Sequence, residues 1–168
     1  MKPSATFPGG FTLAPSEQWE IDYVENNYRE GERREREVEN APPQNLSELE
    51  HCWTVRADNG DIVGYFGVLV MPNESFMSRT RAFCFMSCEN ANRHKLAFVK
   101  ASRPAFRWMV EACPPWTDRF LTWPLESYVA SVRWQEKVLK MRRIARIPAG
   151  SGENYIVMEL TRQEVEKW

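Results

Sequence analysis

An α/β fold with a mixed central sheet and helices on both faces is predicted for this chain, on three observations. The centre, from Ser78 to Arg143, alternates between strand-like and helix-like segments. A hairpin pattern precedes that centre, and a second hairpin pattern follows it. Antiparallel hairpins on either side of a parallel strand–helix–strand–helix unit form a mixed sheet.

The length of 168 residues and the hydrophobic content of 43% fit one ordinary globular domain. We therefore expect a single domain over residues 1–168, with an irregular arm over about residues 1–15 in which only Phe11–Ala14 is strand-like. No apolar run approaches the roughly 20 residues that cross a bilayer, and the N-terminus lacks the apolar core of a signal peptide. A cytoplasmic protein without membrane contact is predicted.

The first helix is expected to begin at Ser16, which can serve as its N-cap. Trp19, Tyr23 and Val24 would supply its apolar stripe. The segment over residues 29–39 consists almost entirely of charged side chains and has little to bury. We expect it to be an exposed connection.

The segments His51–Arg56 and Asp61–Met71 are rich in the branched and aromatic residues that favour strands. Between them lies an Asn59-Gly60 pair, a strong hairpin signal because both residues tolerate positive φ. Two glycines within the second segment predict a bulge or a close backbone approach.

The central unit begins with a buried-strand pattern, Arg81–Cys88. After a polar turn, four apolar residues follow at i, i+3, i+4 and i+7, which aligns them on one helical face. These are Phe106, Met109, Val110 and Cys113. Ser102 is expected as the N-cap of this helix, with Pro104 in its first turn.

The second strand, Asp118–Trp123, stops at Pro124, which has no N–H for a ladder. A second amphipathic helix is predicted from about Glu126 to Arg143. Its apolar side would comprise Ala130, Trp134, Val138 and Met141. Two strands that are each followed by a helix are expected to lie parallel, and residues 143–147 and 153–160 are expected to form the closing hairpin.

Four cysteines, Cys52, Cys84, Cys88 and Cys113, lie in apolar segments, which favours free buried thiols over disulfides. Cys84 and Cys88 together with a histidine suggest a zinc site as an alternative. On one strand the two sulfurs would lie about 13 Å apart at ~3.3 Å per residue, too far for one ion bound at ~2.3 Å. No metal site is therefore predicted.

Charge is distributed unevenly although the net charge is only −1. Residues 17–50 contain eleven acidic and four basic residues, whereas residues 93–146 contain four acidic and twelve basic ones. The basic half can receive an anion such as a phosphorylated cofactor. The alternative, which we favour, is that the charges are solvated surfaces or that the two halves fold against each other.

The order of elements over residues 51–160 resembles that of the Gcn5-related N-acetyltransferases, in which a strand–loop–helix unit holds acyl-CoA. Within that range, residues 100–109 and 123–141 resemble acetyltransferase-like internal virion and hypothetical proteins of short-tailed bacteriophages. The resemblance implies an acyl-CoA-dependent N-acyltransferase that uses acetyl-CoA and acylates a small amine or a protein lysine. It also implies an alternative, a non-catalytic phage structural or assembly protein with phage or other protein partners, located in the host cytoplasm or the virion.

The segment corresponding to the family's pyrophosphate loop, Glu89–Ser102, departs from the glycine-rich pattern because it contains no glycine. Glycines let the backbone approach a pyrophosphate, so this loop is degenerate. The resemblance then leaves Ser102, Lys100 and Arg103 as the groups that can bind an anion, with Arg93 nearby.

For catalysis, acyl transfer to an amine needs a base and an acid for the departing thiolate. Glu89 at the end of the central strand is the expected base, with His94 as an alternative, and Tyr128 or Ser131 is the expected acid. Seven tryptophans suggest nucleic-acid binding as another alternative, but a net charge near zero disfavours it.

Ligands of open α/β sheets bind outside the carboxyl ends of the strands. The predicted ligand-binding residues should therefore converge between the strands that end near Cys88 and Trp123. These residues are Glu89, Lys100, Ser102, Trp123, Tyr128 and Ser131. Because Pro124 cannot pair, it is expected to help the two strands splay into a cleft.

Overall fold

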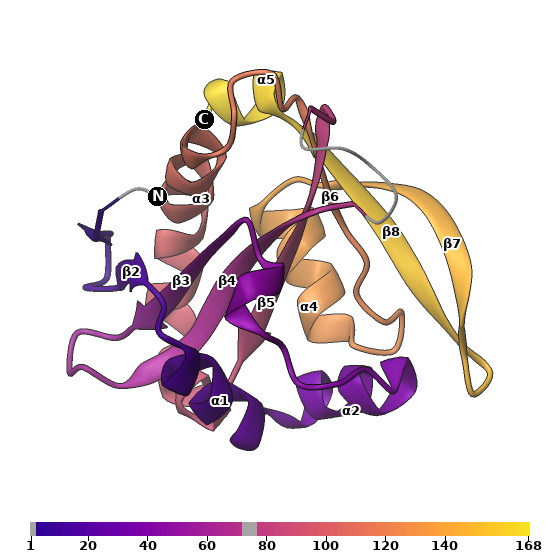
Figure 1. Cartoon of the computed structure of the whole chain (residues 1–168), viewed down its shortest axis with the longest axis horizontal. Helices are drawn as coiled ribbons and strands as arrows, with labels where there is room; N and C mark the ends of the chain where they lie inside the picture. The colour runs from indigo at the N-terminus through magenta and orange to yellow at the C-terminus, as the bar shows by residue number, and fades with distance from the viewer. Residues whose placement is uncertain (1–2, 72–76) are drawn as a thin grey trace.

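The computed structural model describes residues 3–71 and 77–168, and within them one eight-stranded sheet has the order β1-β2-β3-β4-β5-β6-β8-β7 (Figure 1). Neighbouring strands are antiparallel except β5 and β6, which are parallel. The strands are β1 Ala5–Thr6, β2 Thr12–Pro15, β3 His51–Arg56, β4 Ile62–Val70, β5 Thr80–Ser87, β6 Arg119–Thr122, β7 Arg142–Gly150 and β8 Glu153–Thr161. The prediction of a mixed sheet is confirmed.

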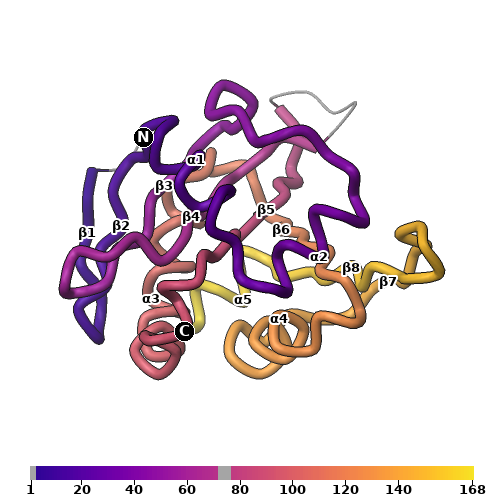
Figure 2. Tube along the Cα trace, turned by 90° about the horizontal axis from the view of Figure 1, so that it is seen from below, coloured from indigo at the N-terminus to yellow at the C-terminus, as the bar shows by residue number. Residues whose placement is uncertain are grey.

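Helices cover both faces of the sheet, as Figure 2 shows with α1 and α2 on one side and α3 and α4 on the other. The α-helices are α1 Gln18–Asn26, α2 Glu30–Glu39, α3 Lys95–Ala112, α4 Val129–Arg133 and α5 Arg162–Glu166. Shorter turns are η1 Leu46–Glu48, η2 Glu89–Arg93 and the π-helical turn η3 Trp134–Val138, which continues α4. One core joins α3 to the sheet, and a second core joins α1 to its other face.

The first hairpin, β3–β4, is confirmed, and its turn uses Gly60 at φ +87°. The register shifts beside Gly64, because Val55 pairs with Gly64 whereas Arg56 pairs with Ile62. A Cβ at Gly64 would lie 2.3 Å from the carbonyl oxygen of Met86. The glycine therefore permits both the bulge and the close approach of β5, as predicted.

The parallel pair is short and opens quickly. Thr80–Ala82 of β5 pairs with Arg119–Leu121 of β6, after which β6 ends at Thr122 while β5 continues to Ser87. The far end of β5 is covered by the link between α1 and α2, where the Arg29 N–H donates to the Ser87 carbonyl at 3.2 Å. A gap in strand pairing therefore remains between Ala82 and Ser87.

Helix α3 begins at Lys95, seven residues before the predicted N-cap, so the prediction for Ser102 is wrong. Ser102 lies inside the helix, where its hydroxyl donates to the Phe98 carbonyl at 2.7 Å. Pro104 likewise lies within the helix rather than in its first turn. The serine–proline pattern resembled a helix start, and the solvent-facing Leu96 weakened the apolar periodicity that precedes it.

Helix α4 with η3 ends at Val138, so the predicted helix to Arg143 is too long. Val132 on this element and Leu139 just after it are buried, whereas Ala130 is exposed. The π turn inserts an extra residue per turn and rotates the following side chains, which a 3.6-residue period does not anticipate. Residues from Arg142 onward instead form β7 of the closing hairpin.

The N-terminal helices also differ from expectation. The N-cap of α1 is Glu17 rather than Ser16, and Trp19 is 53% exposed. Val24 is fully buried, as predicted, together with Ile21. Residues 30–39 are not an exposed connection, because they form α2, and Glu32 on that helix is buried. The arm is more ordered than predicted as well, since β1 and β2 pair at the sheet edge.

Cys52, Cys88 and Cys113 are buried free thiols, as predicted, and Cys84 is a half-buried one. Among residues 3–71 and 77–168, no group of three or more metal-binding side chains is placed to hold an ion. None of the helices in these two ranges is long and apolar enough to cross a membrane.

Arg81 anchors the start of β5, and it allows a test of the fold. Its side chain is fully buried and paired with Glu50 at 2.6 Å. We expect Arg81→Ala to lower the free energy of unfolding by about 3–5 kcal/mol, because it leaves Glu50 without its partner. Arg79→Ala is the control, since that side chain is 74% exposed and should cost less than about 1 kcal/mol. Equal costs in urea unfolding would contradict this.

Candidate functional site

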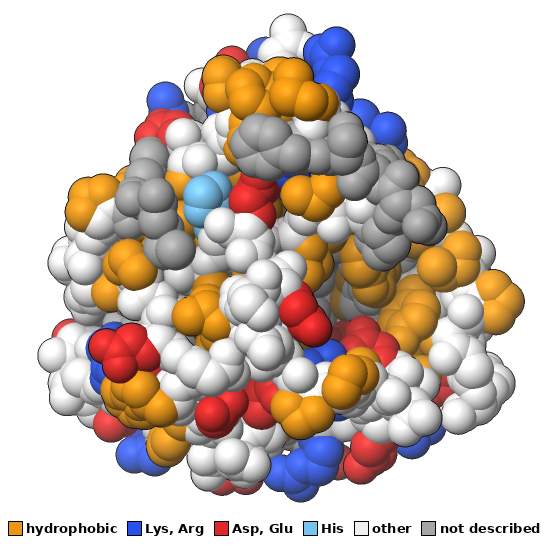
Figure 3. Space-filling model, in the orientation of Figure 1, with side chains coloured by type: hydrophobic (Ala, Val, Ile, Leu, Met, Phe, Trp, Pro, Cys, Tyr) orange, Lys and Arg blue, Asp and Glu red, His pale blue; other side chains and the backbone are white. Residues whose placement is uncertain are grey.

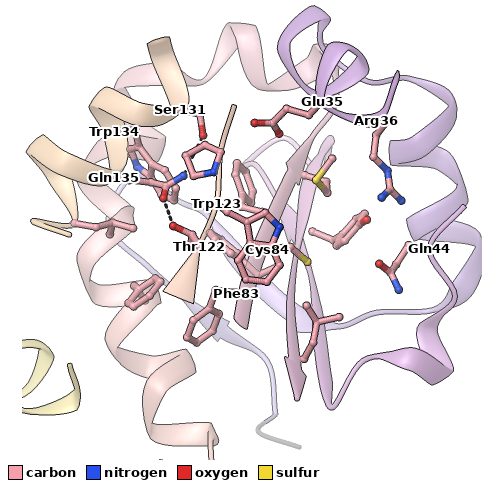
Figure 4. Close-up of a pocket in the computed structure, with 18 of the residues that line it drawn as sticks. Glu35, Arg36, Gln44, Phe83, Cys84, Thr122, Trp123, Ser131, Trp134 and Gln135 are labelled. Carbon is pink, nitrogen blue, oxygen red and sulfur yellow. Dashed lines mark hydrogen bonds between the residues drawn. The ribbon is translucent and has the colours of Figure 1, made fainter. Parts of the chain in front are cut away.

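A cavity of about 220 Å³ lies where β5 and β6 separate (Figure 4). Its walls come from β5, from Thr122–Pro124, from α2 and from η3. Trp123 lines this cavity without closing it. Figure 3 shows acidic and basic side chains interspersed over the side of the molecule that carries α1 and α2. A cavity thus lies between the ends of β5 and β6, where the splayed cleft was predicted.

Two further hollows extend this cavity on the α3 side of the sheet. A second one, also of about 220 Å³, shares Phe85, Ser131 and Trp134 with the first and is lined in addition by Tyr128. A third, of about 620 Å³, lies between α3 and η3 and shares Val99 with the second. The first two hollows thus follow the open edge of β5, and the third continues the row from the second hollow along α3.

Glu35 of α2 lines the first cavity, and its carboxyl group has a strongly shifted pKa. Burial raises the pKa of Glu35 to about 8, although the Leu125 N–H, which donates to Oε1 at 3.0 Å, partly opposes this. Figure 4 shows the Glu35 carboxylate and the Ser131 hydroxyl approaching the cavity from opposite helices. A carboxyl group with this pKa exchanges a proton near neutral pH.

Tyr128 lies in a polar cluster of the second hollow. Its hydroxyl accepts from Arg29 Nη2 at 2.6 Å and donates to Glu32 Oε2 at 2.8 Å. Ser87 donates to the other oxygen of Glu32. Burial and the Glu32 carboxylate raise the pKa of Tyr128, so the phenol keeps its proton. A Cβ at Gly31 would lie 2.2 Å from the Tyr128 ring, so only glycine lets α2 approach it.

Arg36 fixes the part of α2 that borders the first cavity. Its guanidinium binds Glu25 of α1 at 3.0 Å and Glu39 at 3.1 Å. Glu25 also accepts the Gln44 N–H at 2.9 Å. Because these two carboxylates surround one guanidinium, the wall carries an excess of negative charge.

The open edge of β5 offers backbone hydrogen-bonding groups. Successive residues of a strand direct their N–H and C=O groups to opposite edges. Since the Ser87 carbonyl accepts from Arg29 on the β6 side, Phe85 directs its own groups to the same side. Phe85 also lines the first two hollows, so a ligand amide can add to this edge.

The third hollow is basic. Lys100, Arg103, Arg107 and Lys137 line it together with Trp168. Arg103 is held in place, because its Nε donates to the Val138 carbonyl at 2.7 Å and its guanidinium lies 5.5 Å from the Trp168 ring centroid. The row of hollows therefore has an acidic end at α2 and a basic end between α3 and η3.

The predicted site residues are only partly brought together. Trp123, Ser131 and Tyr128 lie along the first two hollows, and Lys100 and Arg103 lie along the third. Ser102 is buried, and its hydroxyl accepts from Trp134 Nε1 at 2.9 Å.

Glu89 lies outside this row of hollows. Its side chain is 68% exposed and lies 3.8 Å from Arg33. The catalytic role suggested for Glu89 stays a prediction.

The sequence interpretation missed Glu32, Glu35 and Glu39. A signal was available, since glutamates at i, i+3 and i+7 fall on one helical face. The charged segment concealed it, because nothing apolar marked that face as facing the protein.

Glu35 also predicts a dependence of stability on pH. Below about pH 4.5 the Glu35 carboxyl is protonated in both the folded and the unfolded protein. Between pH 4.5 and about 8 only the unfolded protein releases this proton, so the free energy of unfolding falls as the pH rises. Relative to wild type, Glu35→Gln should gain stability across this range and level off above it, as measured by urea unfolding at several pH values. Glu37→Gln, at an exposed position of α2, is the control and should show no such gain.

No protein-family model and no curated protein matches this sequence. Solved structures do resemble its fold. Spermidine N-acetyltransferase from Vibrio cholerae, in complex with CoA and spermine, has a TM-score of 0.68 at 10% identity, covering 93% of this chain and 98% of that one. Aminoglycoside acetyltransferase AAC(6')-Ib, in complex with coenzyme A and kanamycin, has a TM-score of 0.66 at 16% identity, with coverages of 94% and 98%.

An acetyltransferase of the GNAT family from Bacillus anthracis has a TM-score of 0.62 at 13% identity, covering 92% of this chain and 96% of that one. None of these three structures is described as a phage protein, so the resemblance to phage proteins stays a prediction. The mixed sheet, the helices on both faces and the near-complete coverage agree with one conclusion. The chain has the fold of the Gcn5-related N-acetyltransferases.

Proposed function

We propose that the protein is an acyl-CoA-dependent N-acyltransferase that acts on small amines. The observation that carries the proposal is the cavity between β5 and β6, which joins a carboxyl group of pKa about 8 to an open strand edge. A base that exchanges protons near neutral pH suits the deprotonation of an attacking amine. The open edge suits an extended ligand that carries amides.

The charges along the row of hollows suit acetyl-CoA, because its phosphates are anionic and the third hollow is basic. The amides of its pantetheine arm would pair with Phe85 on the edge of β5, and its phosphates would lie near Lys100 and Arg103. This basic hollow takes the place of the glycine-rich loop, which the chain lacks. When bound, acetyl-CoA supplies an acetyl thioester.

In the proposed reaction, the amine nitrogen forms a bond to the thioester carbonyl carbon while the carbon–sulfur bond breaks. Glu35 accepts the proton that the amine loses. Tyr128 turns its hydroxyl hydrogen away from Glu32 Oε2, to which it donates in the free protein, and gives that proton to the departing sulfur. Arg29 stabilises the phenolate through the hydrogen bond at 2.6 Å. Transfer of the first proton from Glu35 to Tyr128 through water restores both groups, so an amide and a free thiol are the products.

The acidic end of the row favours a cationic acceptor. Glu35, Glu39 and the Arg36–Glu25 pair border the cavity on the α2 side, which draws an ammonium group toward the base. Two of the similar structures contain spermine or kanamycin. A cavity of about 220 Å³ suits a small amine better than a protein segment, although a single lysine side chain is the nearest alternative.

Incubation with acetyl-CoA and a panel of amines that includes spermidine and kanamycin tests the function. We expect N-acetylated product, with kcat/KM rising with pH until Glu35 is ionised at about pH 8. Glu35→Gln should lower kcat by about 100-fold or more, and Glu37→Gln should not. If acetyl-CoA gives neither binding heat nor product, the non-catalytic assembly role replaces this proposal.

The placement of the phosphates has its own test. Charge reversal by Lys100→Glu with Arg103→Glu should weaken acetyl-CoA binding by about 1–3 kcal/mol in calorimetric titration, because charge-assisted hydrogen bonds are lost. Arg34→Glu combined with Arg79→Glu, at two exposed positions outside the basic hollow, controls for the same change in net charge. Unchanged affinity in the double variant would place the phosphates elsewhere.

A further inference from the structure

Ser131 lies at the junction of the first two hollows, and a directional chain of hydrogen bonds reaches it. Thr122, the last residue of β6, donates from its hydroxyl to Gln135 Oε1, which Figure 4 marks with a dashed line. Gln135 Nε2 in turn donates to Ser131 Oγ at 3.2 Å. These hydrogen bonds lead from Thr122 at the end of β6 to Ser131 at the cavity.

The direction of each bond follows from the groups. In this arrangement the Gln135 Oε1 atom accepts from Thr122, which leaves the amide NH₂ facing Ser131. Once Ser131 Oγ accepts a hydrogen bond from Gln135, its own hydrogen is free to be given away. Both cavities lie in front of that hydroxyl, so a bound ligand can receive it.

The π-helical backbone at Gln135 explains how its side chain reaches both Thr122 and Ser131. Gln135 is only 5% exposed although its side chain is polar, and it lies in the π-helical turn η3. Such turns redirect side chains and occur frequently at functional sites. A buried amide is costly unless it is hydrogen-bonded, and here each of its two ends has a partner.

We propose that Gln135, held by Thr122, is a positioning residue that directs the Ser131 hydroxyl hydrogen into the first two hollows. There Ser131 donates a hydrogen bond to the sulfur of bound acyl-CoA. This inference rests on the proposed function. Ser131 does not lose its proton in this role. Its hydrogen bond stabilises the negative charge that develops on sulfur as the carbon–sulfur bond breaks, while Tyr128 delivers the proton.

The pKa of the thiol of bound CoA, followed by the ultraviolet absorbance of the thiolate, tests the inference without an acceptor. A donor to sulfur lowers that pKa, so we expect it to rise by about one unit in Ser131→Ala and in Gln135→Met. The double variant should equal Ser131→Ala, since Gln135 acts through Ser131. The corresponding loss of kcat for acetyl transfer should be about tenfold, with little change in KM for acetyl-CoA.

Controls separate this role from packing and from nearby charges. Gln44→Met removes another amide that lines the first cavity and should leave the thiol pKa unchanged. Thr122→Val releases the amide without changing Gln135 and should raise the thiol pKa by a smaller amount, which keeps the test valid if Gln135→Met does not fold. The titratable groups that line the two hollows are constant across these variants: Glu35, Arg36, Glu39, Tyr65 and Cys84 in the first, and Arg29, Glu32, Lys95 and Tyr128 in the second.

The outcomes distinguish the inference from the proposed function. If wild type binds no CoA in calorimetric titration, the proposed function fails and the inference fails with it. If CoA binds and its thiol pKa is the same in wild type and Ser131→Ala, only the hydrogen bond to sulfur is refuted. If Ser131→Ala raises the pKa and Gln135→Met does not, the positioning role of Gln135 is refuted.

Discussion

The early end of pairing between β5 and β6 is the constraint on which the site depends. Parallel strands normally continue side by side, but β6 stops at Thr122, and Pro124 offers no N–H to extend the ladder. The unpaired edge of β5 is tolerable because its far end is covered by the Arg29 N–H and its middle faces a cavity. A single break in the ladder thus creates the hollow, exposes backbone groups to it and separates the helices on its two sides.

Helix α2 supplies much of the chemistry of this hollow although it contributes little to the apolar cores. It is held by polar contacts, including those of Arg36 with α1 and of Glu35 with the Leu125 N–H. Gly31 brings it against the Tyr128 ring. Buried carboxylates with such partners are arranged for specific geometry, since burial itself disfavours their charge.

Strand patterns and turn chemistry made most of the sheet predictable from the sequence. The Asn59-Gly60 turn, the glycines of β4 and the proline after β6 each carry a local signal with one physical meaning. The site was less predictable, because α2 has no apolar stripe and the π turn breaks the helical period. The spacing of the glutamates could place Glu35 on one helical face, but the burial that raises its pKa depends on tertiary folding.

Both edge strands of the sheet, β1 and β7, have features that oppose pairing with a further strand. At one edge β1 is only two residues long, and at the other β7 contains Pro148 and two register shifts. Arginines along β7 are paired with carboxylates, as Arg146 is with Glu126. Short edges, prolines, bulges and charges all oppose the addition of another strand. The sheet is therefore protected from edge-to-edge aggregation at high concentration, even though its interior strands are strongly β-forming.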